Sequence, residues 1–210
     1  MNIKIKNAKL NYNLITSIFI NVVIFLCMII LGDVKFETSD DFVMQSIVSG
    51  AYSGNPNPHM MFINVLYGKV LAVLYNIFPN TSWYVYSLLF VGLMSFIVIG
   101  YVILEYIDKP ISYIVLAVLI MFFSDDIYIL IQFTKTASLA VISGSMLFLA
   151  GVIKEKVNKK QVIIGGFIVL LGVMLRYSTI YLAGPFILYD LLCEIVVNRD
   201  KYNIKRLSKI

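Results

Sequence analysis

The feature that most constrains this chain is a series of apolar stretches, each close to the length that a helix needs to cross a bilayer. A hydrocarbon core about 30 Å thick requires roughly 20 apolar residues in helical form. Hydrophobic residues make up 60% of the 210 residues and charged residues only 14%, which lies outside the range of soluble globular domains. The sequence therefore predicts an all-α, polytopic integral membrane protein. We expect a helical bundle of six transmembrane helices in a single domain, over residues 14–31, 83–104, 110–123, 133–153, 161–175 and 179–197.

One further apolar stretch, Met60 to Phe78, decides which side of the membrane each loop faces. It is long enough to span but carries Asn64, Lys69 and Asn76. Lysine and arginine concentrate in cytoplasmic loops, so the basic residues indicate whether this stretch crosses. If it does not cross, thirteen of the seventeen basic residues become cytoplasmic, in the N-terminal segment, the turns at 105–109 and 154–160, and the basic tail at 198–210.

We therefore expect Met60 to Phe78 to form an interfacial or re-entrant helix within an extracytoplasmic loop, residues 32–82. Both termini are then cytoplasmic, in a multi-pass protein of the cell membrane. Seven spans with an unusual charge distribution are the alternative. The first span follows a basic start and is longer than a signal-peptide core, so we expect a signal anchor rather than a removable leader.

Several classes of site have no signature in the sequence. Nucleotide-binding loops, dinucleotide fingerprints and the spacings typical of metal ligands or disulfide frameworks do not occur in it. Membrane lipids are expected partners, and nucleic acid is not.

With this topology, polar and charged residues gather at the extracytoplasmic ends of the predicted helices. The candidates for a site are two acids, a histidine and three cations: Asp40, Asp41, His59, Lys69, Lys135 and Arg176. The acids and the histidine bound the polar stretch SDDFVMQSIVSGAYSGNPNPH, residues 39–59. A binding site at the outer surface requires such a convergence on one face of the membrane. Topology alone leaves open whether these side chains meet.

The two acids also have a purely structural interpretation. Thr38-x-x-Asp41 matches a capping box, so Asp40 and Asp41 could serve only to begin a short helix. Consecutive side chains on a helix point about 100° apart, so at most one of the two is expected to face a substrate. We expect this one to be Asp40, because the capping box already occupies Asp41.

The other candidates have structural interpretations as well. The three cations could extend to the lipid head groups as anchors, and the histidine follows a polar turn where a surface residue is common. Asp125 and Asp126 are expected to cap the fourth span, which leaves the third span short unless its helix continues toward Ile131.

The order of these features resembles the N-terminal module of the GT-C class of membrane glycosyltransferases. In both, a cytoplasmic N-terminus precedes one span and a long outer loop that opens on an acidic pair, here Asp40 and Asp41. The chain is also similar to uncharacterised polytopic proteins of Gram-positive bacteria in the segments SDDFVMQSIVSGAYSGNPNPHMMFINVLYG, FPNTSWY and QFTKTA. Enzymes of the class generally have more spans and often a C-terminal outer domain, so the resemblance also implies a further segment or a membrane protein partner.

This resemblance implies transfer of a glycosyl group from a polyprenyl-phosphate donor at the extracytoplasmic face. A loop aspartate, Asp40 or Asp41, would take the proton of the acceptor hydroxyl. The departing phosphate calls for a cation, and Arg176 and Lys135 are the candidates, with His59 a third and a divalent metal as an alternative. Lys69 completes the predicted substrate-binding set. The rival interpretations are a transporter or flippase for a lipid or polar solute, and a non-catalytic membrane subunit.

Overall fold

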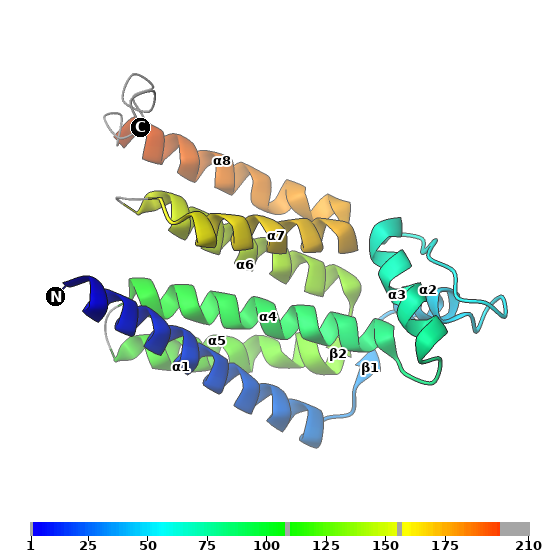
Figure 1. Cartoon of the computed structure of the whole chain (residues 1–210). Coiled ribbons are helices and arrows are strands. Elements are labelled where there is room, and N and C mark those ends of the chain that lie inside the picture. Colours follow the sequence, from blue (N-terminus) through cyan, green and yellow to red (C-terminus); the bar gives the residue numbers. More distant parts are fainter. Residues whose placement is uncertain (1, 108–109, 155–156, 198–210) are drawn as a thin grey trace.

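The computed structural model describes residues 2–107, 110–154 and 157–197, and most of them are helical. A bundle of long helices is formed by α1 (Asn2–Leu31), α4 (Trp83–Tyr106), α5 (Ile111–Ser124), α6 (Phe133–Ile153), α7 (Lys159–Leu175) and α8 (Ile180–Val197) (Figure 1). Two shorter helices, α2 (Ser39–Ser49) and α3 (Val65–Ile77), lie beyond one end of this bundle. The predicted all-α fold class is confirmed.

The two ends of the bundle differ, because α2 and α3 lie beyond only one of them (Figure 1). We call the end beside α2 and α3 the loop end, and the opposite end, where α1 and α7 begin and α4 ends, the basic end (Figure 1). The predicted extracytoplasmic loop lies at the loop end. The predicted basic tail at 198–210 lies outside the described residues. The position of α3 in the membrane interface stays a prediction.

Within the described residues, four helical segments are long and apolar enough to cross a membrane: Tyr12–Leu31, Trp83–Tyr106, Ile111–Ile129 and Phe133–Ile153. They coincide with the first four predicted spans. Helix α7 has 17 residues and is not among the four, and neither is α8, so six spans remain a prediction. The outward faces of the bundle expose large apolar side chains such as Phe19, Phe122 and Phe167. Such a surface is compatible with an integral membrane protein whose helices face lipid.

The third predicted span continues further than 110–123. Helix α5 passes into a π-helical turn, η1 (Asp125–Ile129), which is followed by the short strand β2 (Leu130–Ile131). The helix continues because the sequence that follows Asp125 and Asp126 is apolar. Tyr128 is fully buried, with its ring 5.0 Å from that of Phe25 on α1 and 5.7 Å from that of Phe96 on α4.

The predicted capping role of Asp125 and Asp126 is therefore wrong. Both residues lie in the last helical turn of the third span, not at the start of α6. Helix α6 has Gln132 as its N-cap residue, and no side-chain hydrogen bond caps it.

Helices α6 and α7 pack with their backbones in contact. A Cβ atom added at Gly144 would lie 2.7 Å from the carbonyl oxygen of Gly165, and one added at Gly165 would lie 2.6 Å from the main-chain nitrogen of Phe148. Small residues at these positions therefore allow an approach that a larger side chain would prevent.

A parallel strand pair joins the first loop to the end of the third helix. In β1 (Lys35–Phe36), Lys35 lies opposite Leu130 of β2 and Phe36 opposite Ile131. The main-chain N–H of Glu37 extends the pairing by donating to the Ile131 carbonyl at 3.1 Å. Because α2 follows β1 and α6 follows β2, the pair places the N-terminus of α2 beside the N-terminus of α6.

Candidate functional site

Among the predicted site residues that the structure describes, Asp41 has the side chain with the most hydrogen bonds. Its side chain is fully buried, and its Oδ1 accepts hydrogen bonds from the Tyr84 hydroxyl at 2.8 Å and from the Phe133 main-chain N–H at 3.0 Å. Its Oδ2 accepts a third hydrogen bond, from the Thr38 hydroxyl, at 3.0 Å. One carboxyl group thus connects α2 to the start of α4 and the start of α6.

The local sequence explains why Asp41 points inward and Asp40 does not. Helix α2 buries Asp41, Met44 and Val48, which are spaced three and four residues apart and share one helical face. Asp40 precedes this face and is exposed. The acids therefore differ in environment, as the helical geometry predicts.

The predicted capping box does not form. Thr38 is the N-cap residue of α2, but its side chain accepts no main-chain hydrogen bond and instead donates to the Asp41 carboxyl. The reason is that Asp41 is drawn toward Tyr84 and Phe133, away from the start of its own helix. Burial raises the pKa of the Asp41 carboxyl; its three hydrogen bonds act in the opposite direction, and the charge of Asp40 adds to the increase.

Phe133 connects Asp41 to Arg176. While its main-chain N–H donates to Asp41, its ring lies beneath the Arg176 guanidinium, whose central carbon is 5.3 Å from the ring centroid. Phe62, in the loop before α3, stacks on the same ring with centroids 5.9 Å apart. The main-chain N–H of Asn64 then donates to the Met174 carbonyl at 2.8 Å, which holds this loop against the end of α7.

Arg176 carries a positive charge that no carboxylate neutralises within the described ranges. Its Nε donates to the Ser178 hydroxyl at 3.1 Å, and its Nη1 donates to the Thr134 hydroxyl. None of the ion pairs in the described part of the chain includes it. A guanidinium has five N–H donors, so several remain to bind an anion.

Lys135 is engaged by acids of the chain itself. Its ammonium lies 2.6 Å from Asp126 Oδ1 and 2.8 Å from Glu37 Oε2. This ion-pair network ties the π-helical turn, the residue after β1 and the first turn of α6 together. Lys135 is thus less free than Arg176 to bind a phosphate, although the structure places both at the loop end.

His59 and Lys69 are exposed, and no side-chain contact links either to Asp41 or Arg176 in the part of the chain that the structure describes. The main-chain N–H of His59 donates to the Asn57 side chain at 3.0 Å, which forms the polar turn expected there. Lys69 lies on α3 outside its buried face, which consists of Gly68, Leu71, Ala72 and Tyr75. The predicted set therefore divides into a connected part around Phe133 and an exposed part.

Sequence reasoning missed Phe133, Tyr84 and Glu37. Each contacts a predicted site residue that is more than 40 positions away in the sequence: Tyr84 and Phe133 contact Asp41, and Glu37 contacts Lys135. An apolar ring beside a polar pair, as in Phe133-Thr134-Lys135, gives no distinctive pattern in a chain this rich in phenylalanine. The parallel strand pair brings the segments of Glu37 and Phe133 together.

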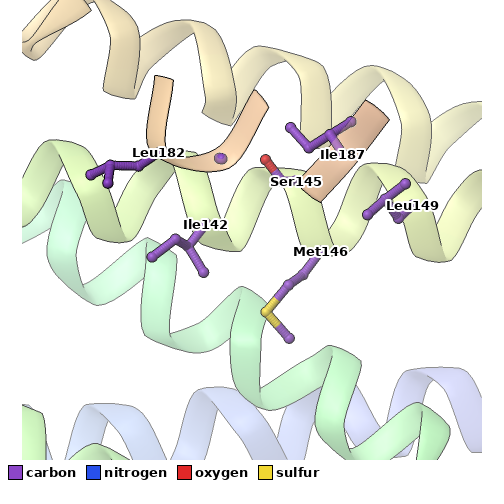
Figure 2. A pocket seen from close by; sticks show the side chains of 7 residues that line it. Ile142, Ser145, Met146, Leu149, Leu182 and Ile187 are labelled. Atoms are coloured by element: carbon purple, nitrogen blue, oxygen red, sulfur yellow. The ribbon is translucent and has the colours of Figure 1, made fainter. Parts of the chain in front are cut away.

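Among the described residues, no metal centre is evident, and a cavity in the bundle offers no second phosphate site. No three His, Cys, Asp or Glu side chains in the described ranges are grouped so that they could hold a metal ion. A cavity of about 410 Å³ between α6 and α8 is lined by apolar side chains apart from Ser145 (Figure 2). Its lining offers no charge to bind a phosphate.

No protein-family model matches the chain, and neither does any curated protein or any solved structure.

Proposed function

We propose that the loop end binds the phosphate of a polyprenyl-phosphate-linked sugar through Arg176 and transfers the sugar to an acceptor hydroxyl. The single observation that supports this most is the position of Phe133. Its N–H is bound to Asp41 and its ring to Arg176, so Asp41, the neighbour of Asp40, and a guanidinium without a carboxylate partner among the described residues lie beside one residue. The resemblance to GT-C enzymes supplies the reaction class.

In the proposed reaction, Asp40 is the general base. Its exposed carboxylate takes the proton of the acceptor hydroxyl while the acceptor oxygen forms a bond to the anomeric carbon of the sugar. The bond from that carbon to the phosphate oxygen breaks, and the phosphate leaves with the electron pair. Arg176 stabilises the resulting negative charge.

Asp41 and Lys135 have positioning roles in this proposal. Asp41 is fully buried and its oxygens are occupied by three donors, so it holds α2 against α4 and α6 and thereby orients Asp40. Lys135 is paired with Asp126 and Glu37 and maintains the loop end. His59 and Lys69 are exposed surface residues and have no role in this proposal.

Binding and catalysis are tested separately. For binding, Arg176→Lys should weaken the affinity of the purified chain for polyprenyl phosphate, because an ammonium cannot reproduce the planar fork of the guanidinium. Lys69→Gln removes a positive charge from the same end and serves as the control. If Lys69→Gln weakens binding as much as Arg176→Lys, general surface charge accounts for the affinity.

For catalysis, the measurement is glycan or glycolipid output in cells that lack the native gene and produce each variant at equal membrane abundance. Asp40→Asn should lower output by about 10² to 10⁴, the usual loss when a general base is removed. Asp41→Asn should retain most of it. Full output from Asp40→Asn would exclude the glycosyltransferase proposal while leaving phosphate binding by Arg176 intact.

A further inference from the structure

A groove at the basic end of the bundle, opposite the site proposed above, has a volume of about 730 Å³. Its walls come from α1 and α7, and its floor comes from α4 and α6. The apolar part of the lining consists of Leu14, Ile18, Ile97, Val98, Leu147 and Ile164, among others. Along α4 the lining extends from Met94 to Tyr101, a distance of about 10 Å at 1.5 Å per residue.

The polar part of the lining is confined to one end of the groove. Asn158, Lys160 and Gln161 come from the start of α7, and Tyr101 comes from the last two turns of α4. The groove is therefore apolar toward the middle of the bundle and polar where the helices end. A lipid in one leaflet has the same distribution, with its acyl chains at depth and its head group at the surface.

Glu105, an acid beside this polar end, is already paired with a lysine. Glu105 accepts from the Lys154 ammonium at 2.6 Å and from the Gln161 side-chain amide at 3.1 Å, and the same amide donates to the Tyr101 hydroxyl at 2.9 Å. The Gln161 side-chain carbonyl oxygen accepts no hydrogen bond although the residue is only 6% exposed. It is an acceptor beside the groove for which the described chain offers no donor.

The other charged side chains that the structure describes in the first turn of α7 are positive. Lys159 and Lys160 are exposed in the first turn of α7 and take part in none of the ion pairs found among the described residues. The first turn of α7 contains no acid, and the free N–H groups of a helix N-terminus add a partial positive charge. The head of the groove therefore favours an anion and repels an ammonium group.

From this arrangement we infer that the groove binds one anionic phospholipid, with its phosphate at Lys160 and an acyl chain along α1, α4 and α7. A hydroxyl in the head group, as in phosphatidylglycerol, also supplies a donor of the kind that the Gln161 carbonyl oxygen lacks. A free phosphate would leave the apolar walls unused. A zwitterionic lipid would bring an ammonium group next to two lysines.

The head-group contact is tested with two adjacent lysines. The purified full chain in a neutral detergent is titrated with phosphatidylglycerol or phosphatidylcholine, and bound lipid is counted by native mass spectrometry. Lys160→Gln should weaken binding of phosphatidylglycerol about fivefold, which is the usual contribution of one basic residue near an anionic lipid. Lys159→Gln removes the same charge from the same turn but lies outside the groove lining, so it should change binding less than twofold. Equal effects of the two variants, or equal binding of the two lipids, would overturn the proposal.

The acyl-chain contact is tested with a second matched pair. Ile164 lines the groove, whereas Ile163 is exposed on the same helix and does not line it. Ile164→Trp should cause loss of the bound-lipid signal by filling the groove, and Ile163→Trp should leave it unchanged. Inorganic phosphate should not bind saturably to the wild-type chain. If it binds with the same dependence on Lys160, or if Ile164→Trp has no effect, the site is one for a free anion and not for a lipid.

Discussion

At the scale of single residues, the two adjacent aspartates illustrate how much one position along a helix changes the chemistry of a carboxyl group. Asp40 is exposed, whereas Asp41 is fully buried and accepts from Tyr84, Phe133 and Thr38. Both donors to Oδ1 are themselves fixed, since one is a main-chain N–H and the other is the hydroxyl of a buried ring. Asp41 is therefore a connection between segments as well as a charge.

The first prediction compares alanine and asparagine at this position. Asp41→Ala leaves the Tyr84 hydroxyl and the Phe133 N–H buried without their acceptor, which should lower the free energy of unfolding by roughly 2 to 6 kcal/mol for the two groups. Asp41→Asn can keep the contacts: its oxygen accepts from both donors, and its NH₂ can donate to the Thr38 hydroxyl, which also accepts. Denaturant unfolding of the purified chain in detergent measures the difference, with the exposed Asp40→Ala as control. If the Ala and Asn variants are equally stable, the hydrogen bonds of Asp41 do not hold these segments together.

The second prediction concerns pH. Because burial raises the pKa of Asp41 above its usual value of 3.8, the folded chain holds this proton more tightly than the unfolded chain. Its contribution to stability is then greatest below about pH 4 and is lost as pH rises through the folded-state pKa. The Tm of the wild type minus that of Asp41→Asn should fall between pH 4 and pH 7, whereas Asp40→Asn should keep most of the wild-type dependence. If this Tm difference instead rises with pH, the three hydrogen bonds lower the pKa of Asp41 by more than burial raises it.

At the scale of elements, the contact between α6 and α7 depends on glycine. Gly165 faces the main chain of α6, where neither the Phe148 nitrogen nor the Gly144 oxygen can move independently of its helix. Gly166, its neighbour, has no atom within 4 Å of an added Cβ. Two successive glycines of one helix thus have opposite packing environments.

The third prediction uses this pair as its own control. Gly165→Ala should force the helices apart and destabilise the chain by about 1 to 3 kcal/mol, as overpacking of a tight contact usually does. Gly166→Ala should be neutral or stabilising by up to about 1 kcal/mol, because alanine favours helix more than glycine. The Tm of each variant in detergent distinguishes the two. If Gly166→Ala is the more destabilising, the packing of α6 on α7 differs from that described here.

At the scale of the whole molecule, the connections alternate between the two ends of the bundle. Helices α1 and α7 end and α4 begins at the loop end, whereas α6 ends and α7 begins at the basic end (Figure 1). This geometry accommodates six spans if α7 and α8 also cross the membrane. The distribution of lysine and arginine then predicts that the loop end lies outside.

The fourth prediction follows from that assignment. Reporter fusions after Gly32, Asn80 and Ser178 should report an extracytoplasmic position, and fusions at Asn158 and Lys209 a cytoplasmic one. Protease accessibility in sealed vesicles provides an independent check of the same positions. An extracytoplasmic signal at Asn158 would exclude the six-span topology and place the lipid groove in the outer leaflet.

The sequence alone located the helices, because membrane crossing depends on a local property, the length of an apolar stretch. All six predicted spans coincide with bundle helices, and the polar segment at 39–59 lies beyond the bundle. Errors arose where a local pattern had two outcomes. Asp125 and Asp126 could either cap the next helix or belong to the end of the previous one. They belong to the previous helix, because it continues far enough to bury the ring of Tyr128.

Which residues meet at the candidate site depends on the tertiary structure. Local patterns do not indicate that Asp41 bonds to Tyr84 and Phe133, that Lys135 is paired with Glu37 and Asp126, or that Arg176 lies over an aromatic ring. These contacts join residues from four separate segments, and they exist because β1 pairs with β2 and α6 packs on α7. Hydrophobicity determines that a helix forms and where, but the polar partners at its end depend on which other helices end beside it.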